Sequence, residues 1–237
     1  MLFRSVWLVK GIFGDIVFEK PSIELRNEGK LTKTEVKVFN IHYNNPPNFK
    51  FTIDQDEHGN EYLKDATEVY DKEYDWLFEN EWRNTFIKQV CKNFDKNILI
   101  LVNSLKHLDR VFCAVKSLED RKVYVIKGEV EKSQRSAIFR EFEHNNNIIC
   151  VAMSTIFSTG IDISNIHMVL FAAGGRSFIR TVQSIGRGIR LGENKDKLTV
   201  IDIADNLKYG SQHLEERLNI YRKEQFPYSV FNIKETT

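Results

Sequence analysis

From about residue 97 onward, short apolar runs alternate with amphipathic stretches along the chain. Runs rich in Val, Ile and Leu are typical of strands buried on both faces, and the intervening stretches have the spacing of helices. This alternation predicts an α/β fold, with a parallel sheet that carries helices on both faces. The expected strands read NILILVNS (97–104), KVYVIKG (122–128), NIICVAMS (147–154), HMVLFAAG (167–174) and KLTVIDIAD (197–205), and the expected helices span Leu105–Leu118, Glu131–Phe142 and a stretch around 176–190.

Residues 1–75 have a less regular pattern and predict an irregular α/β segment. We expect a helix around Ser22–Glu28, a strand over TEVKVFNIHY (34–43) and a hairpin with an acidic loop over FKFTIDQDEHGNEYLKDA (49–66). One long helix over KEYDWLFENEWRNTFIKQVCKNF (72–94) should lead into the sheet. Because periodic apolar positions are too few for a second complete core, we interpret residues 1–75 as a tail or interdomain linker and residues 76–237 as the folded domain.

Small and polar residues follow the expected strands. In open parallel sheets, ligands bind beyond the carboxyl ends of the strands, so these residues predict a surface that contacts a ligand through backbone and hydroxyl groups. The strand ends read Asn103-Ser104, Lys127-Gly128, Ser154-Thr155 and Ala173-Gly174-Gly175.

A second candidate surface is the stretch RSFIRTVQSIGRGIR (176–190). On a helix at about 100° per residue, its polar residues fall within an arc of roughly 80°, opposite an apolar stripe. The cations are all arginine, which suits bidentate phosphate contact, although a solvated face with scattered salt bridges is the alternative. Gly186 and Gly188 each weaken a helix by about 1 kcal/mol, which suggests close approach of a ligand to the backbone. The polar residues of this face are Arg176, Arg180, Gln183, Arg187 and Arg190.

The stretch VAMSTIFSTGIDIS (151–164) carries a third candidate feature. An expected strand ends at Met153, and a turn rich in hydroxyl groups leads to Gly160 and Asp162. Exposed backbone N–H groups and hydroxyls can bind a phosphate oxygen, and Asp162 can accept from a ribose hydroxyl. An ordinary turn capped by Asp162 is the alternative interpretation.

Taken together, the motifs resemble those of a known family. QSIGRGIR (183–190) matches the pattern Q-x-x-G-R-x-x-R of motif VI, and STGIDI (158–163) matches motif V of the superfamily 2 helicases. ILILVNS (98–104) resembles motif IV, and IKGEVEKSQRSAIFREF (126–142) is similar to the segment before motif V. The chain therefore resembles the second, C-terminal RecA-like domain of these helicases from about residue 82 to 228. GIFGDIVFEKPSIELRNEGKL (11–31), KVFNIHY (37–43), WRNTFI (82–87) and HLEERLNIYRKEQFPY (213–228) are similar to phage helicases of the UvsW type.

This resemblance implies a role for each motif. Arg187 and Arg190 would be arginine fingers toward the γ-phosphate of ATP, and Gln183 would couple the nucleotide to the interdomain contact. Gly160 and Asp162 would lie on the nucleotide side of the cleft. The residues implied to hold the phosphate backbone of one strand are Ser104, Gly128, Ser154 and Thr155. ATP and Mg²⁺ would be bound mainly by an N-terminal RecA-like domain.

The family's activity is ATP-driven remodelling of branched or paired DNA in recombination and replication. The implied partners are therefore that N-terminal domain and single-stranded or branched DNA, or an RNA–DNA hybrid. No stretch of this sequence fits the phosphate-binding pattern G-x-x-x-x-G-K-[ST]. DQDEHGN (54–60) resembles an acidic motif II but lacks the preceding apolar strand, so we interpret it as a hairpin loop.

We accordingly expect the isolated chain neither to bind ATP tightly nor to hydrolyse it. An inactive module that binds nucleic acid or a partner protein remains an alternative. Another doubly wound nucleotide-binding protein is a third, which the lack of G-x-G-x-x-G after a first strand disfavours.

Composition narrows the class of protein further. The net charge of +1 gives no global basic field, so any polyanion site must be local. Cys91, Cys113 and Cys150 form no C-x-x-C pair, which favours buried free thiols in a reducing compartment over a metal or redox site, and no metal site is expected. No apolar run approaches the roughly 20 residues of a membrane span, and no signal peptide is evident. We expect a soluble cytoplasmic protein, in the host cytoplasm if the chain is phage-encoded.

Overall fold

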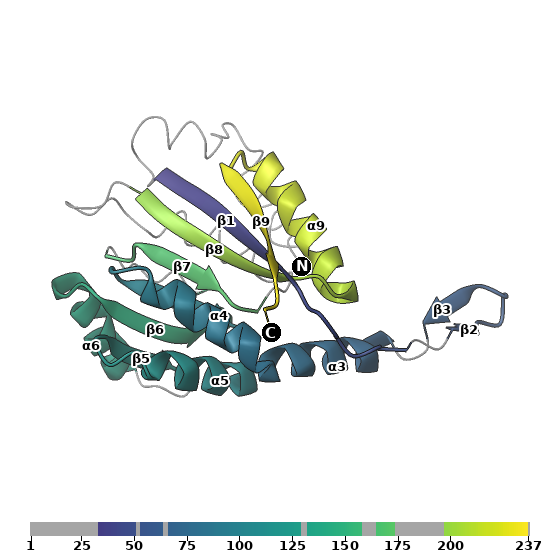
Figure 1. Ribbon diagram of the computed structural model, residues 1–237, viewed down its shortest axis with the longest axis horizontal. Helices are drawn as coiled ribbons and strands as arrows, with labels where there is room; N and C mark the ends of the chain where they lie inside the picture. Colours follow the sequence, from purple (N-terminus) through teal and green to yellow (C-terminus); the bar gives the residue numbers. More distant parts are fainter. Residues whose placement is uncertain are drawn as a thin grey trace, which may run out of the picture.

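The computed structural model describes residues 33–50, 53–63, 66–128, 132–157, 165–173 and 197–236 (Figure 1). These residues contain a seven-stranded sheet in the order β5-β6-β4-β7-β8-β1-β9, with every neighbouring pair parallel. The predicted parallel α/β fold is confirmed, and each predicted apolar run forms a strand. The strands are β1 (Lys33–His42), β4 (Ile98–Val102), β5 (Lys122–Ile126), β6 (Ile148–Met153), β7 (Met168–Phe171), β8 (Lys197–Asp205) and β9 (Tyr228–Lys234).

Helices cover both faces of this sheet, as the alternation predicted. The main helices are α4 (Glu81–Lys92), α5 (Leu105–Lys116), α6 (Lys132–His144) and α9 (Lys208–Lys223), with a short α7 (Ser154–Phe157) after β6. Helices α4 and α5 pack on one face, whereas α6 and α9 pack on the other, so that two separate clusters of apolar side chains form. The neighbouring residues Leu99 and Ile100 of β4 join different clusters, because successive side chains of a strand point to opposite faces.

The long helix predicted over residues 72–94 is wrong in one respect, since two helices occupy this stretch. α3 (Ala66–Glu79) ends where Asn80 begins α4. Asn80 has an extended backbone, and its side-chain oxygen accepts a hydrogen bond from the backbone N–H of Arg83 at 2.8 Å. An Asn side chain in this position satisfies a donor at the start of a helix, so it favours a new helix over continuation of the old one.

A hairpin forms where the sequence predicted one. β2 (Ile53–Gln55) and β3 (Glu61–Leu63) pair antiparallel, and Figure 1 shows them standing away from the sheet beyond α3. The Asp56 carboxylate accepts hydrogen bonds from the backbone N–H of His58 at 2.9 Å and of Asn60 at 2.8 Å. Gly59 adopts a φ of 77°, which glycine tolerates readily. Residues 56–58 thus belong to a turn, as predicted, and do not follow a buried strand.

Strand β1 confirms the strand predicted over residues 34–43 and has a central role in the sheet. It lies between β8 and β9, and Val36, Val38 and Ile41 are fully buried. The boundary at residue 75 stays a prediction, but this strand, which lies before that boundary, belongs to the same sheet as the strands after it.

The pattern of apolar residues did not predict α9 and β9. β9 is an edge strand whose residues are mostly exposed, so it lacks the continuous apolar run of the inner strands. Two further predicted elements lie outside the described residues: the helix around Ser22–Glu28 and the helix around 176–190.

The cysteines follow the sequence prediction only in part. Cys91 and Cys150 are buried free thiols, and burial raises the pKa of the Cys91 thiol to about 12. Cys113 is exposed, contrary to the prediction. It lies on the side of α5 opposite Val111 and Val115, which point into the core.

Candidate nucleic-acid site at the carboxyl edge of the sheet

Residues predicted to hold a strand backbone lie in a row at one edge of the sheet. β5, β6 and β4 are neighbours, with Ile126 opposite Ala152 and Val102 opposite Met153. Gly128, Ser154 and Ser104 therefore follow three adjacent strands at similar levels. Since neighbouring strands are about 4.8 Å apart, the row extends over roughly 10 Å. The structure brings together residues that are up to 50 positions apart in the sequence, which is the separation of Ser104 and Ser154.

Ser154 ties two of these strand ends together. Its hydroxyl donates to the side-chain oxygen of Asn103 at 2.5 Å, and the serine is only 6% exposed. A phosphate oxygen needs a donor, and the hydroxyl proton of Ser154 already has an acceptor. The amide nitrogen of Asn103 supplies two N–H donors that no other side chain in the described part of the chain is seen to use. Asn103 is exposed and is thus a better candidate for phosphate contact than Ser154, which positions it.

Ser104 begins helix α5. Its hydroxyl oxygen accepts from the backbone N–H of His107 at 3.1 Å, so its hydroxyl proton remains available to donate elsewhere. The N-terminus of a helix carries partial positive charge and further free N–H groups. Ser104 is therefore suited, by its side chain and its position, to bind an anionic oxygen.

Gly128 and Thr155 complete the predicted set. The carbonyl of Gly128 accepts a hydrogen bond from Arg135 at 2.7 Å. A Cβ atom built on Gly128 would meet no atom within 4 Å, so the fold itself does not require glycine there. Thr155 is exposed and lies in the short helix α7. Both positions are open to a ligand that approaches the edge.

The residues predicted on the nucleotide side lie outside the described residues, and their arrangement stays a prediction. They are Gly160, Asp162, Gln183, Arg187 and Arg190, together with Arg176 and Arg180 of the same predicted helix face.

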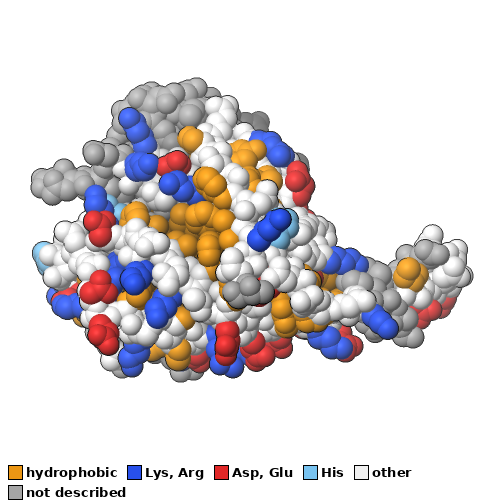
Figure 2. Space-filling model, in the orientation of Figure 1, with side chains coloured by type: hydrophobic (Ala, Val, Ile, Leu, Met, Phe, Trp, Pro, Cys, Tyr) orange, Lys and Arg blue, Asp and Glu red, His pale blue; other side chains and the backbone are white. Residues whose placement is uncertain are grey.

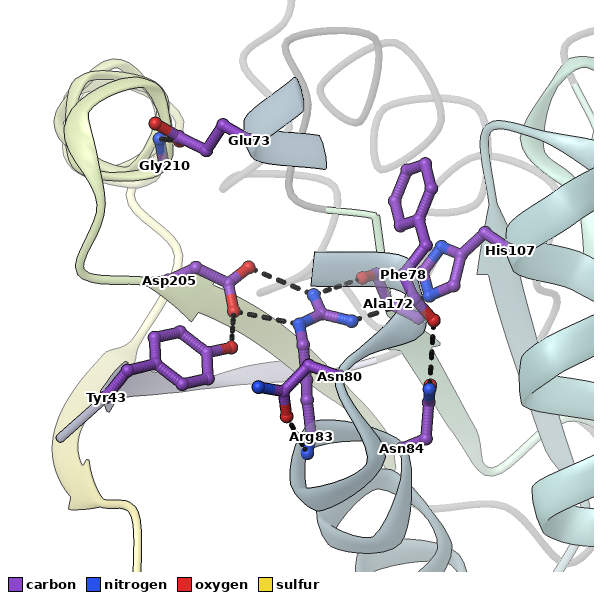
Figure 3. Close-up of polar contacts among 10 residues, drawn as sticks. All are labelled: Tyr43, Glu73, Phe78, Asn80, Arg83, Asn84, His107, Ala172, Asp205 and Gly210. Carbon is purple, nitrogen blue, oxygen red and sulfur yellow. Dashed lines mark hydrogen bonds and ion pairs between the residues drawn. The ribbon is translucent and has the colours of Figure 1, made fainter. Parts of the chain in front are cut away.

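A buried ion pair supports the same edge of the sheet (Figure 3). The Arg83 guanidinium donates to Asp205 through Nε at 2.8 Å and Nη2 at 3.0 Å. Nη2 also donates to the carbonyl of Ala172 at 2.6 Å, and the hydroxyl of Tyr43 donates to Asp205 at 2.6 Å. Burial opposes the charge of Arg83, but the Asp205 carboxylate outweighs this effect and raises the pKa of Arg83. These contacts join α4 to the ends of β7, β8 and β1.

Sequence reasoning missed this network. An acidic residue at Asp205, at the end of an otherwise apolar run, was the available signal, because a buried carboxylate requires a partner. Nothing in the sequence indicated that the partner would be Arg83, which is 122 positions away.

Two further buried groups surround the ion pair. The ring of His107 stacks on Phe78 with centroids 4.2 Å apart, and burial, aided by the nearby Arg83 charge, lowers the pKa of His107 well below its ordinary value. The Glu73 carboxylate accepts from the backbone N–H of Gly210 at 2.9 Å, at the start of α9. A Cβ on Gly210 would lie 2.3 Å from the carbonyl oxygen of Asp205, so only glycine fits this close approach.

Hydrophobic side chains gather on one face between α4 and the β8–β1–β9 end of the sheet (Figure 2). Phe39 of β1 contacts Phe86 of α4 and Phe231 of β9, with ring centroids 5.5 and 5.6 Å apart, and Trp82 stacks on Phe86. Phe231 is 43% exposed. Phe39, Trp82 and Phe86 pack against the apolar cluster on the α4 and α5 face of the sheet.

Among the described residues, no helix is long and apolar enough to cross a membrane. The described ranges also hold no group of three or more His, Cys, Asp or Glu side chains arranged to bind a metal ion.

A parallel sheet with helices on both faces and polar strand ends at one edge defines an α/β domain of the RecA-like type. Residues 82–192 match the family model of the helicase conserved C-terminal domain. The chain is 29% identical over 237 residues to the ATP-dependent DNA helicase uvsW of Enterobacteria phage T4. The aligned region covers 92% of this chain and 44% of that protein.

Solved structures show the same fold. The crystal structure of T4 UvsW matches with a TM-score of 0.65 at 24% identity, over 86% of this chain and 42% of that one. The DNA-bound ATP-dependent Type ISP restriction-modification enzyme LlaBIII matches with a TM-score of 0.61 at 14% identity, over 96% of this chain and 17% of that one.

Residues 82–192 thus match the helicase conserved C-terminal domain, and the chain is similar to UvsW, which is the resemblance that the motifs predicted. The chain spans less than half the length of the curated helicase that it resembles.

Proposed function

We propose that this chain is the C-terminal motor half of an ATP-dependent superfamily 2 DNA helicase or translocase that remodels branched or paired nucleic acid. In this role it supplies a surface for one strand backbone and arginine fingers for ATP hydrolysis. The observation that carries the proposal is the row of polar strand ends beside the N-terminus of α5, where Asn103 and Ser104 offer donors to phosphate oxygens.

The strand surface holds a strand through ordered hydrogen-bond donors and does not read its bases. Asn103 is held by Ser154, and Ser104 is held by its bond to the start of α5, so both donors are ordered before a strand binds. Contacts of this kind go to phosphate groups and carry no information about bases. We therefore expect these phosphate contacts to add no sequence preference, and we expect weak binding by this half alone because only a few phosphates are contacted.

We assign the nucleotide side to residues of the matched motifs. Arg187 and Arg190 would stabilise charge that develops on the transferred phosphoryl group, and Gln183 would link the nucleotide to the contact between domains. Gly160 and Asp162 would contact the nucleotide from this side. We assign the phosphate cradle and magnesium to an N-terminal RecA-like domain, because no stretch of this sequence fits the phosphate-binding pattern G-x-x-x-x-G-K-[ST].

The deciding experiment mixes this chain with a separately expressed N-terminal RecA-like domain and measures ATP hydrolysis with and without single-stranded DNA. Hydrolysis should require both halves and rise with DNA, and Arg187→Ala should lower it by about a thousandfold. Arg176→Ala is the matched control, since it removes an arginine from the same predicted helix face but outside the motif, and hydrolysis should be nearly unchanged.

The alternative is an inactive module that binds nucleic acid or a partner protein. Retained DNA binding by this chain, with no hydrolysis after mixing under any of these conditions, would establish that alternative and remove the motor assignment.

A further inference from the structure

A pocket of about 430 Å³ opens beside the strand-contact surface. It lies between α3, the end of β4 and the start of α5, and Asn103 and Ser104 form one side of it. Tyr70, Tyr74 and Phe78 of α3 form an aromatic wall of the pocket. Its volume falls in the lower part of the range typical for small-ligand sites, about 300–1,000 Å³. An α-helix, with a diameter of about 10–12 Å, is too large for it.

The aromatic wall is built on one face of α3. Tyr70, Tyr74 and Phe78 follow at intervals of four, which places them one above the other along the helix. The ring centroids of Tyr70 and Tyr74 are 4.5 Å apart, and those of Tyr74 and Phe78 are 5.8 Å apart. Because Phe78 also stacks on the buried His107, the wall is ordered without a ligand.

Tyr70 is the most accessible ring of this wall. Tyr74 and Phe78 are 8% and 7% exposed, whereas Tyr70 is half-buried. The hydroxyl of Tyr74 forms a hydrogen bond with the ring nitrogen Nδ1 of His213 at 2.8 Å, and this bond fixes the position of the Tyr74 ring. A planar group that enters the pocket would therefore meet the Tyr70 ring first.

The carboxylates on the α3 side of the pocket disfavour a phosphate group inside it. The Lys106 amino group lies 3.2 Å from Asp75 and 3.0 Å from Glu79, so its charge is already balanced by carboxylates. Asp71 adds a further carboxylate to the pocket lining. An anion would be repelled here, whereas an uncharged ring that carries amino donors could stack on Tyr70 and donate to a carboxylate.

We propose that the pocket receives one unpaired nucleobase of the strand whose phosphates lie on Asn103 and Ser104. This inference rests on the proposed strand-contact function and adds base stacking to it. A strand that passes the row of donors has its bases within reach of the adjacent pocket, and any base can stack on an aromatic ring. Adenine, cytosine and guanine bind better than thymine, because only they carry an exocyclic amino group that Asp71 or Asp75 can accept from.

The test measures the affinity of the full chain at low salt for oligonucleotides of about ten nucleotides, a length within the usual site size of such surfaces. The probes are oligo-dC, oligo-dT and an abasic strand of equal length. Wild type should bind oligo-dC about tenfold more tightly than the abasic strand, with oligo-dT between them. Tyr70→Leu keeps apolar bulk but removes the ring, and should bind all three alike. Tyr70→Phe keeps the ring and should behave as wild type.

Each other outcome overturns the proposal in a distinguishable way. Equal preference for oligo-dC in wild type and Tyr70→Leu would leave the phosphate surface intact and remove the base pocket. A wild type that binds none of the strands would remove both assignments together. Unchanged DNA affinities in Tyr70→Leu, with weaker binding to the separately expressed N-terminal domain, would assign the pocket to a protein side chain. Thermal unfolding of each variant by circular dichroism shows whether the fold is retained.

Discussion

The guanidinium group of Arg83 binds the Asp205 carboxylate through two N–H donors while both side chains are buried. This pair connects the first turn of α4 to the end of β8, and its bond to Ala172 reaches the end of β7. The carboxyl edge of the sheet therefore depends on an interaction in the interior of the domain. A strand-binding surface must be rigid to orient its donors, and Figure 3 shows this pair joining α4 to the ends of β7 and β8.

Removing one partner of this pair should strongly destabilise the domain. We expect Arg83→Ala to lower the free energy of unfolding by about 3–5 kcal/mol, because it leaves the Asp205 carboxylate buried without its cation. The double variant Arg83→Met/Asp205→Leu should lose much less, since it removes both charges. Urea unfolding measures the change. The exposed pair of Lys197 and Glu35 is the control, and Lys197→Ala should change stability by less than about 1 kcal/mol. Equal losses for Arg83→Ala and the double variant would contradict this account.

Asn80 should contribute to stability by starting α4. Replacing it with alanine removes the acceptor for the backbone N–H of Arg83 and should cost about 1 kcal/mol. For a chain of this size, this corresponds to a decrease of about 2–4 °C in the unfolding temperature. Asn80→Asp retains an acceptor and should leave the unfolding temperature nearly unchanged. If α3 and α4 could merge into one helix without cost, Asn80→Ala would be stabilising instead.

His107 should make the domain sensitive to acid. Burial, followed by the Arg83 charge, lowers its pKa in the folded state, so below the ordinary His pKa of about 6.5 the unfolded chain binds a proton that the folded chain does not. Stability should therefore fall as pH decreases below about 6.5, down to the lowered folded-state value. The free energy of unfolding, measured between pH 7 and pH 5, should decrease less steeply with falling pH in His107→Gln than in wild type.

A substitution at Gly128 should affect DNA binding without affecting stability. A Cβ has space at this position, so Gly128→Ala should leave the unfolding temperature unchanged or slightly higher. If a strand backbone approaches Gly128 closely, the same methyl group should weaken binding to single-stranded DNA. Fluorescence anisotropy with a labelled oligonucleotide at low salt measures this effect. Unchanged affinity in Gly128→Ala would move the strand path away from the end of β5.

Asn103 should contribute more than Ser154 to the part of DNA binding that comes from hydrogen bonds to phosphate. We expect Asn103→Ala to weaken binding of single strands of any sequence, because the lost contact is to phosphate. Asn103 and Ser104 are uncharged and release no counterions, so for the wild type the logarithm of affinity should fall only shallowly with the logarithm of salt concentration. Ser154→Ala should weaken binding less, through loss of the bond that holds Asn103. A steep slope in wild type would indicate a larger basic surface than the described residues provide.

The isolated chain should not hydrolyse ATP. The arginines assigned to catalysis act on a nucleotide that we place mainly on another domain, so they have no bound phosphate to stabilise when the chain is alone. A coupled assay with excess Mg²⁺ and DNA provides the measurement. Turnover that disappears in Arg187→Ala would show that this chain holds its own nucleotide site.

The sequence by itself determined the parallel α/β fold, the position of each inner strand along the chain and the resemblance to helicase C-terminal domains. Inner strands such as β4 and β8 are continuous apolar runs because both of their faces are buried, and this signal is local. The family motifs are likewise local, although the residues of motif VI lie outside the described part of the structure. The acidic turn at Asp56 was also predictable, because Asp and Gly have well-defined roles in tight turns.

Only the tertiary structure decided how distant segments meet. In the structure, β1 lies between β8 and β9, and two helices that meet at Asn80 replace the single helix predicted over residues 72–94. Arg83 binds Asp205. The structure also showed that Ser154 positions Asn103, and that the aromatic face of α3 forms a pocket beside Ser104. A repeating pattern in sequence reports which side of an element is buried, but it does not report which other element covers that side. Contacts between residues more than a hundred positions apart have no such pattern and follow only from the folded arrangement.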